Sequence, residues 1–166
     1  MGYLRAIGLR AWLYLCGILA ARTEDSNVER RDWVLAALDA ADGEPLTPIQ
    51  LQKSLFLLGK ERPQVARRRF YKFTPYSYGP FDSSIYRDAQ SLSDEGLITI
   101  SQPDSGTREY RTTAAGSKAA RSLDFKPDAR GDLLRIVSHV TSLTFRELVS
   151  EIYKRYPGTR IRSVFR

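Results

Sequence analysis

Residues 82–112 read DSSIYRDAQSLSDEGLITISQPDSGTREYRT, and this stretch decides the fold. Its first half predicts a helix, because apolar residues recur there at helical spacing. These residues are Ile85, Ala89 and Leu92. Asp82 belongs to the residue types that cap the start of a helix, and Gly96 to those that end one. We therefore expect a helix over residues 82–95.

The second half of the stretch predicts a β-hairpin. Residues 97–101 alternate between apolar and polar side chains, as a strand with one buried face does. The turn residues PDSG follow at 103–106, and residues 108–112 supply the returning strand. A helix of small residues is expected next, over about 113–122.

Two helices are expected before this stretch. Ser26 and Glu29 form the S-x-x-E pattern of a capping box and open a helix that ends at Gly43. Thr47 and Gln50 form a second box, with a proline at the first helical position, and open the next helix.

The order of three helices, a hairpin and further helices is typical of a winged helix. We predict a mainly α fold with a small β-hairpin, a winged-helix-like helical domain with additional C-terminal helices. This single domain is expected over residues 26–166, after an N-terminal extension or helix over residues 1–25. The additional helices are expected over 132–140 and after a third capping box, formed by Thr144 and Glu147.

The segment at 60–80 departs from a compact helix-turn-helix, whose two helices are joined by a turn of three or four residues. It is basic at first, then aromatic, and two prolines interrupt it. We expect a short extended piece there, with a turn at residues 78–80.

The charge balance favours an anionic partner. Lysine and arginine number 26 against 19 for aspartate and glutamate, which gives a net charge of +7. A cationic surface suits a phosphate backbone, so the leading prediction is a winged-helix DNA-binding transcriptional regulator. In such a fold the third helix enters the major groove and the hairpin contacts the flanking backbone. The predicted DNA-binding residues are Arg67, Arg68, Arg69, Lys72, Ser83, Ser84, Arg87, Gln90, Arg108 and Arg111.

Arg87 also has a plainer interpretation, in which it pairs with a neighbouring acid on a solvated helix face. Asp88, Asp94 and Glu95 lie in the same helix and would repel DNA if they faced it. Both interpretations of Arg87 stay open at this point.

A second group of motifs carries a family resemblance. The run PIQLQKSLF at 48–56, followed by Tyr78-Gly79-Pro80 and a helix that contains Tyr86, resembles the Panacea (SocA-like) antitoxin domain. The resemblance spans roughly residues 46–157. It implies a mostly helical, non-enzymatic adaptor that binds and neutralises a protein toxin, or delivers it to a protease. The residues expected to bind the partner are Gln52, Lys53, Tyr76, Tyr78, Gly79 and Pro80.

The composition argues against most enzyme chemistry. Cys16 and His139 are the only residues of their types, so a Cys/His zinc site cannot be built from one chain. His139 lies in a mainly apolar helical stretch, where a core position is its ordinary role. No glycine-rich phosphate-binding motif occurs. We therefore predict no catalytic residue, no metal and no cofactor.

Residues 1–21 have a basic start and an apolar run, which imitate a secretory signal. Arg10 leaves the apolar run too short to span a bilayer. The alternatives are an amphipathic helix docked on the body and an upstream extension. We expect a cytoplasmic protein with no membrane span, whose partner is double-stranded DNA or an acidic protein such as a toxin. A homodimer through the C-terminal helices is compatible with both functions.

Overall fold

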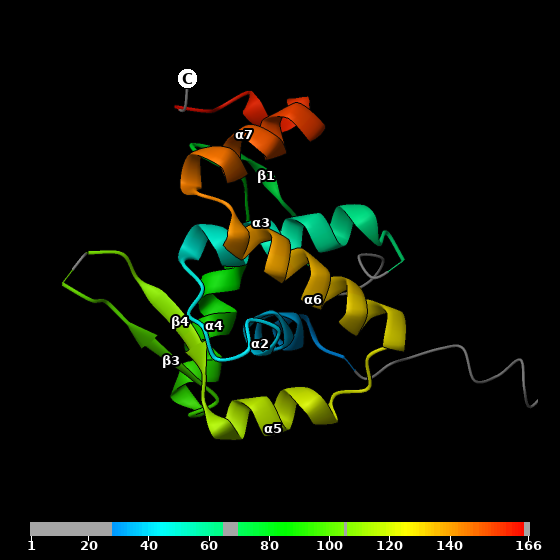
Figure 1. Ribbon diagram of the computed structural model, residues 1–166, viewed down its shortest axis with the longest axis vertical. Coiled ribbons are helices and arrows are strands. Elements are labelled where there is room, and N and C mark those ends of the chain that lie inside the picture. Colours follow the sequence, from blue (N-terminus) through cyan, green and yellow to red (C-terminus); the bar gives the residue numbers. More distant parts are fainter. Residues whose placement is uncertain (1–27, 65–69, 105, 165–166) are drawn as a thin grey trace, which may run out of the picture.

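The computed structural model describes residues 28–64, 70–104 and 106–164 (Figure 1). Its helices are α2 (Arg30–Asp39), α3 (Pro48–Glu61), α4 (Ser84–Asp94), α5 (Ala114–Ser122), α6 (Pro127–Ser142), α7 (Phe145–Arg155) and the short 3-10 helix η1 (Pro157–Arg160). Its antiparallel hairpins are β1 (Thr74–Tyr76) with β2 (Gly79–Phe81), and β3 (Ile98–Ser101) with β4 (Glu109–Thr112). The predicted fold class is confirmed, with a second small hairpin added to it. The predicted extension at 1–25 lies outside the described residues.

The elements from α2 to β4 follow the winged-helix order. We call the hairpin of β3 and β4 the wing, and an isolated antiparallel β-bridge joins it to the segment between α2 and α3. The N–H of Leu46, between α2 and α3, donates to the carbonyl of Tyr110 in β4 at 2.9 Å. The N–H of Tyr110 donates back to the Leu46 carbonyl at 3.0 Å. Both side chains are fully buried, so the hairpin of β3 and β4 is anchored in the core at this point.

The centre of the core is formed by α2 and α3. Every residue at 33–38 in α2 and at 51–58 in α3 is buried, as expected of helices enclosed on all sides. Figure 1 shows α2 in the middle of the molecule, and it packs against α3, α4, α5 and α6. The Trp33 ring centroid lies 4.3 Å from that of Phe125 and 5.8 Å from that of Phe70, which brings three distant segments together. None of the described helices is long and apolar enough to cross a bilayer.

Two of the predicted capping boxes are confirmed. The Thr47 hydroxyl accepts the Gln50 N–H, and the Gln50 side chain accepts the Thr47 N–H at 2.9 Å. Thr144 and Glu147 make the same reciprocal pair at the start of α7. Because each box satisfies orphan donors within a single turn, it starts its helix whatever packs around it.

Two predicted boundaries are wrong. The first helix begins at Arg30, where Glu29 and Asp32 form the capping box. Ser26, the predicted cap, lies outside the described residues. The helix expected over 132–140 begins five residues earlier, at Pro127, since proline at the first helical position loses no hydrogen bond.

The aromatic segment between α3 and α4 is a hairpin rather than a single extended piece. Thr74 pairs with Phe81 and Tyr76 with Gly79, which leaves a two-residue loop at Ser77 and Tyr78. The turn therefore comes one residue earlier than predicted. Figure 1 shows this hairpin beside α7, away from the wing, so the long insertion leaves α3 and α4 in the winged-helix order.

Candidate partner-binding groove and nucleic-acid face

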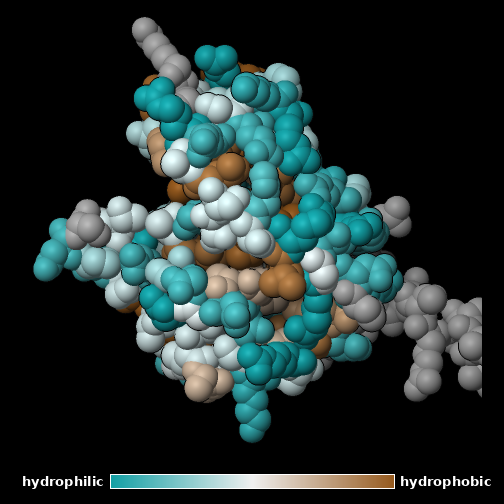
Figure 2. All heavy atoms as spheres, in the orientation of Figure 1, coloured by the Kyte–Doolittle hydropathy of each residue, from teal (hydrophilic) through white to brown (hydrophobic). Residues whose placement is uncertain are grey.

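An apolar groove of about 610 Å³ lies where α3, the hairpin of β1 and β2, and the α6–α7 junction meet. Figure 2 shows apolar surface at the waist between the end that carries α7 and the body below it. Apolar and aromatic side chains make up most of the walls, as in typical ligand pockets. The lining residues are Thr47, Pro48, Ile49, Gln50, Gln52, Lys53, Tyr76, Tyr78, Gly79, Phe81, Tyr86, Thr107, Leu143, Phe145 and Leu148.

The rim of the groove is aromatic. Tyr76, Tyr78 and Phe145 are 54%, 46% and 45% exposed. The rings of Tyr78 and Phe145 meet edge to face with centroids 5.3 Å apart, which joins the β1–β2 loop to the start of α7. Tyr76 packs on Phe81 at 4.9 Å. Two of the predicted partner-binding residues, Tyr76 and Tyr78, are thus exposed on one surface.

Gln52 and Lys53 have a different place from the one predicted, since they are only 2% and 3% exposed. The Gln52 amide donates to the Asp82 carbonyl at 2.9 Å and accepts the Asp82 N–H at 3.1 Å. The Lys53 ammonium donates to the Pro80 carbonyl at 2.8 Å. In the free protein these side chains hold the backbone that joins β2 to α4. Burial lowers the pKa of Lys53 to about 7.

Gly79 and Pro80 are also buried, so they shape the hairpin beneath the exposed tyrosines. Gly79 has a φ of +95°, a region that glycine enters at little cost. A Cβ at Gly79 would lie 3.4 Å from the Lys53 Nζ and 3.5 Å from the ring of Tyr153. The glycine-proline turn and the buried lysine therefore belong to one packed unit.

The outward face of α4 carries three of the predicted DNA-binding residues. Ser83, Arg87 and Gln90 are exposed, and the Gln90 amide donates to Asp94 at 2.9 Å. Ser84, predicted to contact DNA, is 4% exposed and bonds to the Asp82 carboxylate through its N–H and its hydroxyl. Ser84 is thus the first residue of α4, and its N–H and hydroxyl are satisfied by Asp82 rather than by solvent.

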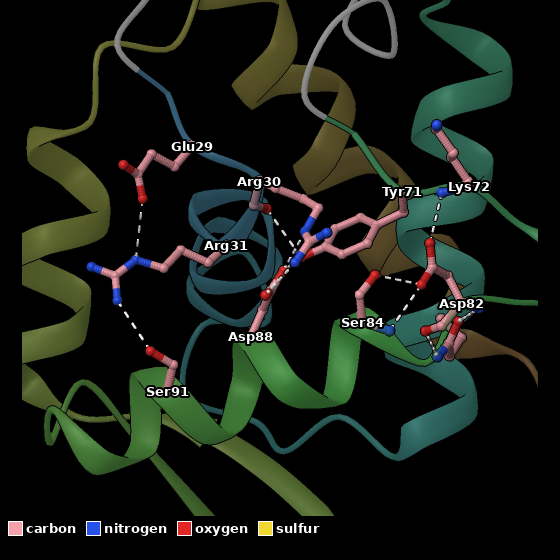
Figure 3. Close-up of polar contacts among 10 residues, drawn as sticks. Glu29, Arg30, Arg31, Tyr71, Lys72, Asp82, Ser84, Asp88 and Ser91 are labelled. Atoms are coloured by element: carbon pink, nitrogen blue, oxygen red, sulfur yellow. Dashed lines mark hydrogen bonds and ion pairs between the residues drawn. The ribbon is translucent and has the colours of Figure 1, made fainter.

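Asp88 of α4 turns toward α2, as Figure 3 shows. Asp88 forms a bidentate ion pair with Arg30, with both contacts at 2.7 Å, and accepts a hydrogen bond from the Tyr71 hydroxyl at 2.8 Å. Burial, and then this hydrogen bond to Asp88, raise the pKa of Tyr71. Glu95, which follows α4, forms an ion pair with Arg31 through a single contact. The plainer alternative for Arg87 stays a prediction, since no acid among the described residues forms an ion pair with it.

The remaining predicted cations lie around this face. Arg108 and Arg111 are exposed on the wing, and the Arg111 guanidinium donates to the Gly43 carbonyl. Lys72 is exposed, while its backbone N–H donates to Asp82 at 2.7 Å. Arg67, Arg68 and Arg69 lie outside the described residues.

His139 is not the core residue that its apolar neighbours suggest. Its side chain is 44% exposed on α6, and its Nε2 lies 3.0 Å from the Glu151 carboxylate of α7. No group of three or more His, Cys, Asp or Glu side chains in the described segments could hold a metal ion. Comparison with protein-family models and with curated proteins finds no match for this sequence.

Proposed function

We propose that this chain is a non-enzymatic adaptor, which holds an apolar segment of a protein partner in the groove. The exposed aromatic rim of Tyr76, Tyr78 and Phe145 carries this proposal. Rings that leave about half of their surface in water gain roughly 25 cal/mol for each Å² that a partner covers. The antitoxin resemblance supports the same function, with a toxin as the partner.

Co-expression with the product of a neighbouring gene tests the adaptor function. We expect the two proteins to co-purify, and any growth arrest caused by the neighbour to be relieved. Replacing Tyr78 and Phe145 together by serine should abolish both effects, because two rings leave the rim. Leu134→Ser is the matched control, since Leu134 is 55% exposed on α6 and does not line the groove. A partner that binds the Tyr78/Phe145 double variant as tightly as it binds the natural chain contradicts the proposal.

A DNA-binding regulator is the second candidate, and the division of charge on α4 supports it. Arg87 and Gln90, which are types able to read base edges, point away from the core. Asp88 and Glu95, which would repel a phosphate backbone, are neutralised by Arg30 and Arg31 on the other side. The outward face of α4 thus offers Arg87 to a major groove, beside the exposed Asp94, which accepts the Gln90 amide.

Gel retardation of random duplexes over a range of salt concentrations tests this candidate. Binding through several phosphates should weaken steeply as salt rises. Arg87→Ala should relax sequence preference, with a loss of about 1–3 kcal/mol at the preferred site. Arg108→Ala should weaken all sequences alike. Arg121→Ala, an exposed change on α5, is the control. Absence of retardation at low salt would exclude the DNA candidate.

A further inference from the structure

Lys53 is a buried lysine to which none of the described residues supplies a counter-charge. It lies in the middle of α3 with 3% of its surface exposed, and its Nζ donates to the carbonyl of Pro80. An ammonium group has three donors, and no described residue forms an ion pair with this one. Lysines are almost never fully buried unless they are paired. Within the described segments Lys53 therefore has the Pro80 carbonyl as a hydrogen-bond acceptor but no carboxylate.

The surroundings of Lys53 suit an anion. Among the residues that line the groove there is no aspartate or glutamate, and Lys53 is their single charged side chain. The first turn of α3, from Thr47 to Gln50, lines the same groove, and the start of a helix adds positive potential. Apolar walls strengthen such interactions, because they exclude water.

We infer that the groove recognises an apolar protein segment that carries an acidic side chain, whose carboxylate pairs with Lys53. This inference rests on the proposed adaptor function and adds the chemistry of the bound segment. Charge complementarity selects this occupant: the aromatic rim covers apolar side chains, and the Lys53 ammonium takes the carboxylate between them. A segment without the acid would bury the same rings but leave the ammonium unpaired.

Proton uptake accompanies this binding. With a pKa of about 7, Lys53 is partly neutral in the free protein at neutral pH, and a bound carboxylate favours its charged form. The titratable groups nearby are the phenols of Tyr86, which lines the groove from α4, and Tyr153 of α7, which lies with Lys53 at Gly79. Neither phenol supplies a carboxylate. The preference for an acidic segment should therefore fall as the pH rises above 7.

Two dansylated peptides test the inference, dansyl-Phe-Glu-Phe-amide and its glutamine counterpart, which differ in one charge and hardly in shape. In fluorescence titrations of the full chain at pH 6.5, the glutamate peptide should bind about tenfold more tightly. Lys53→Met should abolish this preference, and Lys118→Met, an exposed lysine on α5, should leave it unchanged. At pH 8.5 the natural chain should lose much of the preference, while the glutamine peptide binds as before. This last measurement needs no variant, so it holds even if Lys53→Met does not fold.

The outcomes separate this inference from the adaptor function. Equal affinity for the two peptides overturns the carboxylate assignment and leaves the groove as a docking site. A preference that survives Lys53→Met in a folded protein, or that does not change with pH, overturns the assignment to Lys53. Failure of both peptides to bind the natural chain counts against the groove, and hence against the inference and the proposed function together.

Discussion

At Gly79 a single backbone angle disfavours a side chain. Its φ is +95°, in the left-handed region that L side chains rarely adopt, whereas a Cβ would make only ordinary contacts there. Gly79→Ala should therefore lower the free energy of unfolding by about 1–2 kcal/mol, as urea unfolding followed by circular dichroism can measure. Gly131→Ala is the opposite control, because Gly131 lies within α6 with open space around it. There alanine should raise stability by about 0.5–1 kcal/mol, and a loss of equal size at both glycines would contradict this account.

At the scale of the element, Asp82 holds the start of α4 by accepting the N–H of Ser84 at 2.8 Å and that of Lys72 at 2.7 Å. Burial raises the pKa of Asp82, but these hydrogen bonds outweigh it and keep the pKa below its ordinary value. The stabilisation is thus present above the unfolded pKa of about 4 and is lost as the pH falls through the lowered value. Asp82→Ala should cost about 1 kcal/mol of unfolding free energy at pH 7 and less at pH 3. Ser83→Ala, at a side chain without a cap bond, should cost little at either pH, and an equal cost would contradict the role of Asp82.

At the scale of the whole molecule, ion pairs of Glu61 join α3 to the two C-terminal helices. Its carboxylate lies 2.7 Å from Arg135 of α6 and 3.0 Å from Arg155 of α7. Both arginines are partly exposed, so the pairs are worth up to about 1 kcal/mol each and are screened by salt. Glu61→Gln should lower the free energy of unfolding by about 1 kcal/mol at low salt and by less in concentrated sodium chloride, as urea unfolding would measure. Glu44→Gln, at an exposed glutamate without an ion pair in the described segments, should change little, and equal losses would contradict the network.

The candidate site was predicted in part. Tyr76, Tyr78, Arg87 and Gln90 are exposed, as contact residues must be. Ser84 is the clearest error, because a position one residue from an exposed serine on a helix can face the core. The rim ring of Phe145 was missed as a site residue, since it meets Tyr78 only through the packing of α7 on the first hairpin.

By itself the sequence determined where α3 and α7 start and where the wing turns, because capping boxes and turns act within three or four residues. Tertiary structure alone decided which way the polar residues face. Gln52 and Lys53 carry polar groups on a helix, yet α3 is enclosed on all sides, so they bond to the backbone at 80–82. Burial depends on segments far apart in the chain, and no local pattern encodes it. The groove is a product of that packing, since its walls come from α3, the first hairpin, α4, the wing and the α6–α7 junction.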